Sequence, residues 1–507
     1  MTRNDSRIKN SIRNIISSII TISFITIMPF IIRTIMARIM GIECLGLNSF
    51  LMSIIQILNL SELGIGSVIA FFLYAPIAVN DRVKVNAYLN ILHRFYNVVG
   101  VVILLAGIII LPFIKCFVKG AIPSNLNMYL CFILYLFGSA IEYFFYPEEM
   151  SLIDAFQHKD INNKICLIAN SVTYLIQVIA LVFFHNYYIY LVAIIVQGVL
   201  LGQLRKYYGH RYFDQYRPMG ELSTDEKKEI KKKALSMLGH QIDEKLFNSI
   251  DTVFISNIIG LTAVAIYGNY FYIIVAVSFL FETIYISIVP SIGNALVLDS
   301  SADNCSRFYN IFWIGACLTG LASTCFICMC QNFMMLWMGT DKMLGMDMVV
   351  LFCIYFYLSQ IRRTVVTFKN AAGMWWNDRY KPYISMAVDL LLDLVLIRYI
   401  GVKGAIISSI VCVGIIEIPC ETRVLFRDYF NISTKQYIIK MLTYGVVNLG
   451  IITLVYLICR VWVPETGIVS LLIRMLICCG SVIIYAAVYW RSKEFRAWRG
   501  TLKGLRK

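Results

Sequence analysis

Long apolar segments recur along the whole chain, and no other feature restricts its fold as strongly. Each is close to the roughly 20 residues that a helix needs to cross a bilayer. Six candidate spans precede a polar loop and eight follow it: 12–36, 47–74, 94–117, 126–146, 164–184 and 187–206, then 236–258, 263–291, 307–331, 347–370, 382–400, 403–424, 436–460 and 467–490. The pattern predicts an all-α polytopic membrane protein with about 14 transmembrane helices.

The composition agrees with a membrane protein. Hydrophobic residues make up 59% of the chain and charged residues 15%, whereas soluble domains carry about 25% charged residues. Lys and Arg number 45 against 30 Asp and Glu, an excess that suggests nucleic acid in a soluble protein. Here the basic residues cluster between apolar runs, so they act first as topology signals and no nucleic-acid partner is expected.

The basic clusters also orient the chain. One side collects the basic N-terminus, the long loop after the sixth span and the tail "RSKEFRAWRGTLKGLRK", while the opposite side holds few basic residues. The positive-inside rule therefore places both termini in the cytoplasm, which an even number of spans permits. The N-terminal apolar run lacks a cleavage site and is longer than a signal peptide's, so we expect a retained first helix.

The 15 cysteines, an odd number, lie mostly in apolar segments. This distribution argues against a secreted disulfide framework. The cluster "CFICMC", with Cys325, Cys328 and Cys330, is interpreted as small apolar thiols in a helix. No metal and no cofactor are expected.

The polar loop contains "ELSTDEKKEIKKKALSMLGH", residues 221–240. Ser223 followed by Glu226 predicts a capping box at the start of a helix. We expect this helix to lie along the inner surface and to lead into the seventh span. Its lysines serve as a topology anchor or, alternatively, attract anionic lipid or substrate.

Two weak internal matches suggest a repeat. One aligns Glu62 with Glu282, and the other aligns Ala193 with Ala405, at similar offsets. Six spans per repeat is an even number, so both repeats would cross the membrane in the same sense and form two lobes around a central cavity. The expected organisation is an N-lobe, a basic loop with an amphipathic helix, a C-lobe, and two additional helices with a basic tail: 1–206, 207–235, 236–430 and 431–507.

Four segments between about residues 11 and 425 carry a family resemblance: "SIRNIISS", "LGLNSFLMSIIQILNLSELGIGS", "NSIDTVFISNIIG" and "FKNAAGMWWNDRYKP". The chain resembles the Wzx-type oligosaccharide flippases of the MOP (MATE-like) superfamily. The resemblance implies export of polyprenyl-diphosphate-linked sugars across the bacterial inner membrane. It also implies membrane lipid and polysaccharide-assembly proteins as partners, and it leaves the sugar unidentified.

Four cationic residues in the spans are candidates for binding an anionic headgroup: Arg33, Lys245, Arg362 and Arg363. Charged groups at membrane depth usually face protein or water because they are costly in lipid. Arg33 follows Pro29 near the outer end of the first span, where it either lines a cavity or snorkels to the interface. Arg362 and Arg363 lie roughly 11 Å inside the cytoplasmic edge, a suitable depth for a diphosphate, and topology anchoring is the alternative.

Five acidic residues in the spans are candidates for coupling or for a polar cavity: Glu62, Asp251, Glu282, Asp389 and Asp393. Glu62 and Glu282 align in the repeat and could carry H⁺ or Na⁺, or make structural hydrogen bonds. Lys245 and Glu282 lie at similar depths and could pair. Asp389 and Asp393 are four residues apart and share one helix face, where they could bind a cation or sugar hydroxyls or simply line water.

Three other functions compete with a flippase. A cation-coupled multidrug exporter of the same fold would favour acidic cavities and twelve spans. A membrane enzyme of polysaccharide assembly would need a catalytic group, and none of the five His forms one with a nucleophile. The last is a scaffold that does not transport. Tyr267, Tyr270, Tyr272, Trp375 and Trp376 could stack on sugars, but such residues more often belong to the core or to an interfacial belt.

Overall fold

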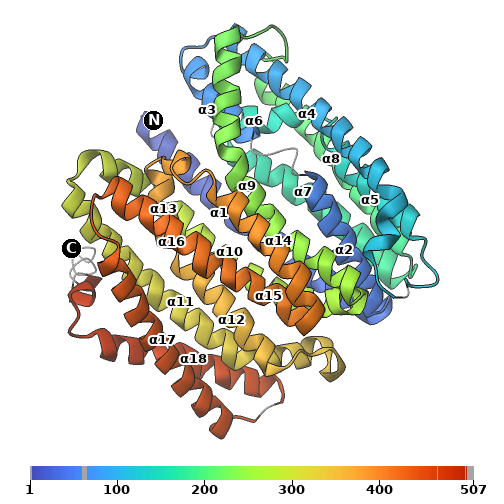
Figure 1. The fold of residues 1–507 in the computed structure, drawn as a ribbon. Helices are drawn as coiled ribbons and strands as arrows, with labels where there is room; N and C mark the ends of the chain where they lie inside the picture. Colours follow the sequence, from blue (N-terminus) through green and yellow to red (C-terminus); the bar gives the residue numbers. More distant parts are fainter. Residues whose placement is uncertain are drawn as a thin grey trace. The chain divides into compact units, whose positions relative to one another are not determined.

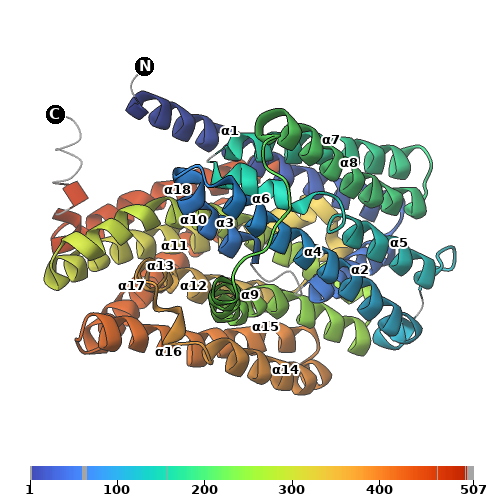
Figure 2. The ribbon, with the colours of Figure 1, turned by 90° about the horizontal axis from the view of Figure 1, so that it is seen from above.

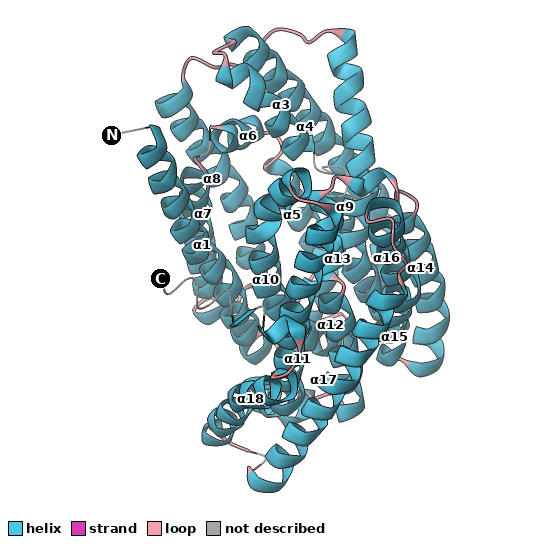
Figure 3. Ribbon diagram, turned by 90° about the vertical axis from the view of Figure 1, so that its left-hand side faces the viewer, coloured by secondary structure: helices cyan, strands magenta, loops and turns pink. Residues whose placement is uncertain are grey.

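The computed structural model describes residues 3–59, 65–120, 122–156, 158–464, 466–496 and 498–499, without the side chains of 3–16, 19, 67 and 235–248. Within these ranges every regular element is a helix (Figure 3). The chain divides into two compact units, Met1–Ala265 and Ile266–Lys507.

The first unit contains nine α-helices and one short 3₁₀ helix in its described part, coloured blue to green in Figure 1. They are α1 (Arg3–Ile39), α2 (Ile42–Leu58), α3 (Ile65–Ala78), α4 (Arg82–Ile110), η2 (Leu111–Phe117), α5 (Met128–Ile141), α6 (Pro147–Ala155), α7 (Lys159–Val182), α8 (Tyr187–Phe213) and α9 (Thr224–Ile258). Helix α7 packs between α1 and α8, and α5 packs on the other side of α8. Helix α9 packs along α2.

The second unit begins within α10 (Leu261–Leu298). The remaining elements are α11 (Ser301–Met338), η3 (Thr340–Lys342), α12 (Met346–Ile361), α13 (Arg363–Ala371), η4 (Met374–Trp376), α14 (Lys381–Ile400), α15 (Val402–Val411), η5 (Cys412–Glu417), α16 (Ile418–Arg423), η6 (Val424–Tyr429), α17 (Lys435–Trp462) and α18 (Ile468–Tyr489). Helix α11 contacts α12, α17 and α18, and α14 lies beside α15 (Figure 2).

The described residues include ten helices that are long and apolar enough to cross a membrane. The other four predicted spans coincide with α2 and α3, with α5, with α9 and with α14. Helix α5 has only 14 residues, and α14 carries several charged residues that lower its hydropathy. In its described residues, each predicted span thus coincides largely with a helix or a series of helices, so the all-α polytopic fold is confirmed.

Local sequence signals explain several helix boundaries. The predicted capping box at the start of α9 is confirmed, because the Ser223 hydroxyl accepts from Glu226 N at 3.3 Å and the Glu226 carboxylate accepts from Ser223 N at 3.0 Å. Gly260 separates α9 from α10 with φ of 132°, a backbone conformation that favours glycine. The predicted surface helix and the seventh span form one continuous helix, Thr224–Ile258.

Apolar side chains lie both inside the units and on their outer faces. Leu105 and Ile109 of α4 and Ile483 of α18 are more than half exposed, as expected for helix faces that contact lipid. Inside the second unit, aromatic rings from α11, α13, η6 and α17 form the core, and Phe308 contacts both Phe368 and Phe426 edge-on. This core includes α13, which carries Lys369 of the charged network described below, and η6, which directly follows α16.

Candidate functional site

Three of the predicted residues, Arg33, Lys245 and Asp251, lie in the described part of the first unit. Arg33 of α1 is half-buried and donates from Nη1 to Ser49 Oγ of α2 at 3.3 Å. Asp251 of α9 is buried. The side chain of Lys245 lies outside the described residues, and so does the whole of Glu62, so both remain predictions.

Arg362 lies at the junction of α12 and α13 and binds two buried carboxylates. Its Nη1 is 2.5 Å from Glu417 Oε2 and 2.8 Å from Glu421 Oε1. Glu417 ends the π-helical turn η5 and Glu421 belongs to α16. Because two carboxylates hold this guanidinium, its geometry favours a structural role over a contact with substrate.

Two lysines extend the charged network around Arg362. Lys381, at the start of α14, donates to Glu421 Oε1 at 2.9 Å. Lys369 of α13 pairs with Asp378 in the segment before α14, and both side chains are almost fully buried. The network is balanced, with three cations and three carboxylates: Arg362, Lys369 and Lys381 with Asp378, Glu417 and Glu421.

Sequence reasoning missed this network. The segment "FKNAAGMWWNDRYKP" supplies Lys369, Asp378 and Lys381, but in the sequence it indicated only a family resemblance. Glu417 and Glu421 are four residues apart in the span 403–424, the same spacing that drew attention to Asp389 and Asp393. Applying that spacing rule to every span would have found them.

Arg363 has different surroundings from its neighbour. Its Nε donates to the neutral Gln360 Oε1 at 2.7 Å, and Gln360 in turn donates to Ser278 Oγ of α10 at 2.9 Å. The Arg363 side chain is half-buried. The bond to Gln360 fixes the plane of the guanidinium, which suits a group that must present a fork of donors to an anion.

Helix α14 carries a row of buried polar side chains. They follow one another at steps of four residues: Lys381, Ser385, Asp389 and Asp393. Residues four apart lie on one helix face, and the row from Lys381 to Asp393 extends about 18 Å along the helix at 1.5 Å per residue. The predicted shared face of Asp389 and Asp393 therefore belongs to a longer polar row that begins at the charged network.

Hydrogen bonds connect this row to the next helices. Ser385 donates to Glu417 Oε1 at 3.1 Å, and Ser408 of α15 donates to Asp393 Oδ1. Asp389 lies one turn before Asp393 on the same face of α14. Because Glu417 also binds Arg362, buried polar groups connect the charged network with the two aspartates.

The remaining predicted residues are members of neither the charged network nor the polar row on α14. Glu282 of α10 is half-buried. Tyr270 is fully buried and bonds Gln331 at 2.9 Å, and Tyr267 is buried against Phe352. Both tyrosines therefore belong to the core, whereas Trp376 is exposed and contacts Arg379.

The first unit also contains a polar cluster that sequence reasoning missed. His93 Nδ1 of α4 is 3.1 Å from Glu148 Oε1, at the start of α6. The adjacent Glu149 lies against Gly209 of α8. Burial, followed by the nearby Glu148, raises the pKa of Glu149 to about 7, against the opposing effect of Arg217. The Glu149 carboxyl therefore changes its charge near neutral pH.

Comparisons with known proteins identify the family and the fold of the chain. A family model described as "Polysaccharide biosynthesis protein" matches residues 11–296. The structure is similar to the lipid II flippase MurJ in an inward closed conformation, with a TM-score of 0.68 and 12% identity, over 96% of this chain and 99% of that chain. A search of curated proteins found no significant match.

Two further solved structures share the fold. An inward-facing multidrug resistance MATE family transporter of the MOP superfamily matches with a TM-score of 0.63 and 13% identity, over 81% of this chain and 98% of that chain. A MOP superfamily transporter from Pyrococcus furiosus matches with a TM-score of 0.55 and 12% identity, over 84% of this chain and 97% of that chain. The chain therefore has the MOP-type fold, as its motifs predicted.

Proposed function

We propose that this chain, which belongs to the family described as polysaccharide biosynthesis proteins, flips polyprenyl-diphosphate-linked oligosaccharides. The family match covers more than half of the chain and is the observation that carries the proposal. As a multi-pass membrane protein of the bacterial inner membrane, it would move repeat units from the cytoplasmic to the outer leaflet. The surface polysaccharide built from these units would be an O-antigen, a capsule or an exopolysaccharide.

The extent of the fold supports a flippase over a drug exporter. The similarity to the lipid II flippase leaves only 4% of the 507 residues uncovered, which is less than the 28 residues of α17. The similarity to the MATE transporter covers 81% of this chain. This nearly complete coverage supports counterparts for α17 and α18 in a flippase of a lipid-linked precursor, as the predicted fourteen-helix count requires.

In this proposal the cations hold the diphosphate. Arg363 is the leading candidate, because a hydrogen bond to Gln360 orients its guanidinium, whereas two carboxylates hold the guanidinium of Arg362. Arg33 is proposed to meet the headgroup later in its passage, and Lys245 remains a candidate. Arg362 acts through the ion network, which holds α12, α14 and α16 together.

The buried row on α14 is proposed as the path of the coupling ion, H⁺ or Na⁺. Asp389 and Asp393 would take up the ion, because paired carboxylates in a span usually mark an ion or proton route. Asp251, Glu62 and Glu282 remain candidates for the same role. Neutralising the two aspartates by ion binding would change the charge on one face of α14 and so favour one of two transport states.

The transport cycle would be alternating access by two lobes, as in other transporters built from repeats. The saccharide would occupy a polar cavity and the polyprenyl tail would stay in lipid. Both termini would lie in the cytoplasm, on the side with the basic clusters. No catalytic step is proposed, and polysaccharide-assembly proteins are the expected partners.

The decisive experiment measures flipping in inner-membrane vesicles. Vesicles from a strain lacking the gene are compared with vesicles from the same strain carrying it. The readout is the fraction of lipid-linked oligosaccharide that a membrane-impermeant sugar-modifying enzyme reaches from the outer-leaflet side. We expect the fraction to rise only when the protein is present. An unchanged fraction would contradict a flippase and favour drug export, which cation-drug efflux assays on the same strains would detect.

A further inference from the structure

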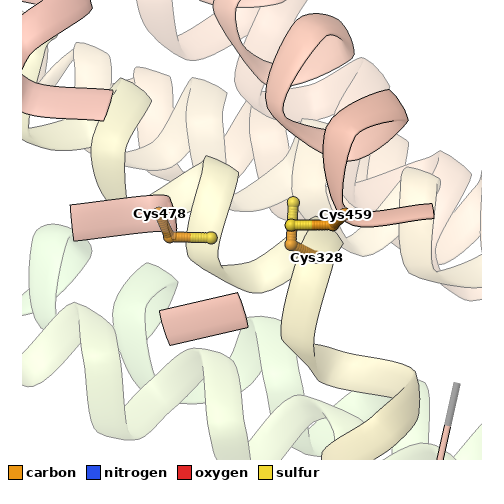
Figure 4. A group of neighbouring side chains, drawn as sticks. All are labelled: Cys328, Cys459 and Cys478. Atoms are coloured by element: carbon orange, nitrogen blue, oxygen red, sulfur yellow. The ribbon is translucent and has the colours of Figure 1, made fainter. Parts of the chain in front are cut away.

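Three buried cysteines from three helices meet inside the second unit. They are Cys328 of α11, Cys459 of α17 and Cys478 of α18, and their sulfur atoms all lie within 4.8 Å of one another. Figure 4 shows the thiol of Cys478 directed toward the other two. The sequence placed Cys328 only with its neighbours Cys325 and Cys330, so this cluster is a product of the fold.

The cluster is enclosed by tightly packed helices. Helix α11 packs along both α17 and α18, and none of the three side chains is more than 3% exposed. Sulfur atoms this close, and held from three directions, form a preorganised set of soft donors. Thiolates select soft ions such as Cu(I) over hard ions such as Mg²⁺ or Ca²⁺.

A buried cation lies beside the cluster. Arg474 of α18 is 6% exposed, and its Nη1 donates to the backbone oxygen of Cys328 at 3.1 Å. Its Nη2 donates to the carbonyl oxygens of Val463 and Pro464 at 3.2 and 3.3 Å. In the part of the chain that the structure describes, Arg474 Nε is buried with no hydrogen-bond partner and the side chain pairs with no carboxylate.

A buried guanidinium without an anion is costly, because its charge has been removed from water without compensation. The thiols of the cluster are the groups nearby that could become anionic, and Cys459 lies within electrostatic range of Arg474. The two observations are independent: one is a set of soft ligands, and the other is a positive charge that an anionic complex would neutralise.

We propose that Cys328, Cys459 and Cys478 form a binding site for Cu(I), with Arg474 as its charge-neutralising neighbour. Binding converts two thiols to thiolates and releases two protons, so Cu⁺ and two thiolates carry a net charge of −1. The third sulfur remains a neutral thiol donor. Arg474 then brings the local charge to zero, and no oxidant or reductant is required.

Zinc is disfavoured by the number of ligands. Structural Zn²⁺ takes four ligands, whereas three sulfurs lie close to one another in this cluster. Cys325 lies near Cys478, but it does not belong to the set of mutually close sulfurs. A bound Cu(I) would connect α17 and α18 to α11. This role is independent of the proposed transport function.

The test uses the purified, reduced full-length protein in detergent under anaerobic conditions. Cu(I) is supplied in competition with a chromogenic Cu(I) chelator, and X-ray absorption reports the ligands. We expect about one tightly held ion per chain, with two or three sulfur ligands. The variant C328S/C459S/C478S should lose this ion, and Arg474→Gln should weaken binding by about 10–100-fold, as changes beside metal ligands do.

A matched control replaces three buried cysteines elsewhere, C44S/C131S/C353S, and should keep the ion. The single variant Cys459→Ala keeps two thiols and serves if the triple variant does not fold; it should bind more weakly. Retention of Cu(I) by the triple variant, equal loss in the control, or a preference for Zn²⁺ would overturn the proposal. None of these outcomes depends on whether the protein flips lipid-linked sugars.

Discussion

Two adjacent arginines show how strongly a residue's role depends on its partners. Arg362 binds two carboxylates, whereas Arg363 bonds the amide of Gln360. The sequence could place both at a depth suited to a diphosphate, because depth follows from counting residues along a helix. It could not separate them, because Glu417 and Glu421 come from a helix more than fifty residues later.

Arg363→Ala should reduce flipping about ten-fold or more at normal protein levels, because hydrogen bonds to charged groups contribute about 1.5–3 kcal/mol. The measurement is the initial rate of outer-leaflet exposure in the vesicle assay. Arg363→Lys keeps the positive charge but loses the forked set of N–H donors, so its flipping rate should lie between those of the wild type and the alanine variant. Wild-type rates in the alanine variant would exclude this residue from substrate binding.

Arg362→Ala should act on stability instead. Removing this cation leaves Glu417 and Glu421 buried beside each other with fewer partners, which costs about 3–5 kcal/mol when a buried pair is broken. The midpoint of thermal unfolding in detergent should fall. Adding Glu417→Gln should restore part of the loss, because one buried charge is then removed. An unchanged midpoint in the single variant would show that the network contributes little.

Glu149 should make stability depend on pH. Its pKa is raised to about 7, first by burial and then by Glu148, so the folded protein binds this proton more tightly than the unfolded chain. Its stabilising contribution is complete below about pH 4.5 and is lost as the pH rises through about 7. Thermal unfolding midpoints measured from pH 5 to 8 should decline.

Glu149→Gln should flatten that decline, and the difference from wild type should be about 1–3 kcal/mol across the range. Asp225→Asn, which changes a carboxylate whose side chain is 96% exposed, is the matched control and should leave the slope unchanged. If Glu149→Gln retains the wild-type slope, another group controls the pH dependence.

At the scale of elements, hydropathy predicted where helices run but not where they bend. The span 347–370 is divided at Arg362 into α12 and α13, and the span 403–424 contains the π-helical turn Cys412–Glu417. Both irregularities coincide with charged residues of the network. A hydropathy average cannot show this, because it registers a buried ion pair only as lower hydrophobicity.

Close approach of α14 and α15 should be essential for the polar row. A Cβ on Gly404 would lie 2.4 Å from the backbone carbon of Leu396, so Gly404→Ala must separate the two helices. Ser408, one turn later, would then move away from Asp393. We expect destabilisation of about 1–3 kcal/mol, typical of overpacking, together with slower flipping.

Gly450→Ala is the control for this element. Gly450 lies in α17, and an added Cβ there meets nothing within 4 Å, so the change should be neutral or slightly stabilising because alanine favours helix. Thermal unfolding of both variants distinguishes the outcomes. Equal midpoints would mean that α14 and α15 tolerate a wider separation.

At the scale of the whole molecule, the predicted orientation depends on many residues, whereas a predicted contact depends on a few. Basic clusters set the sidedness of the chain through many residues together, so errors at single positions matter little. The cysteine cluster is the opposite case, because it depends on three helices meeting. No spacing in the sequence joins Cys328 to Cys459 and Cys478.

Orientation itself can be tested with one exposed native thiol. Cys116 lies exposed in η2, which the charge pattern places outside, whereas Ser223 lies in the basic loop that it places inside. In intact cells a membrane-impermeant maleimide should label the wild type, and Cys116→Ser should abolish that labelling. Ser223→Cys in the Cys116→Ser background should be labelled only after permeabilisation. The reverse pattern would invert the whole topology and would move Arg363 to the outer leaflet, where a cytoplasmic diphosphate could not meet it first.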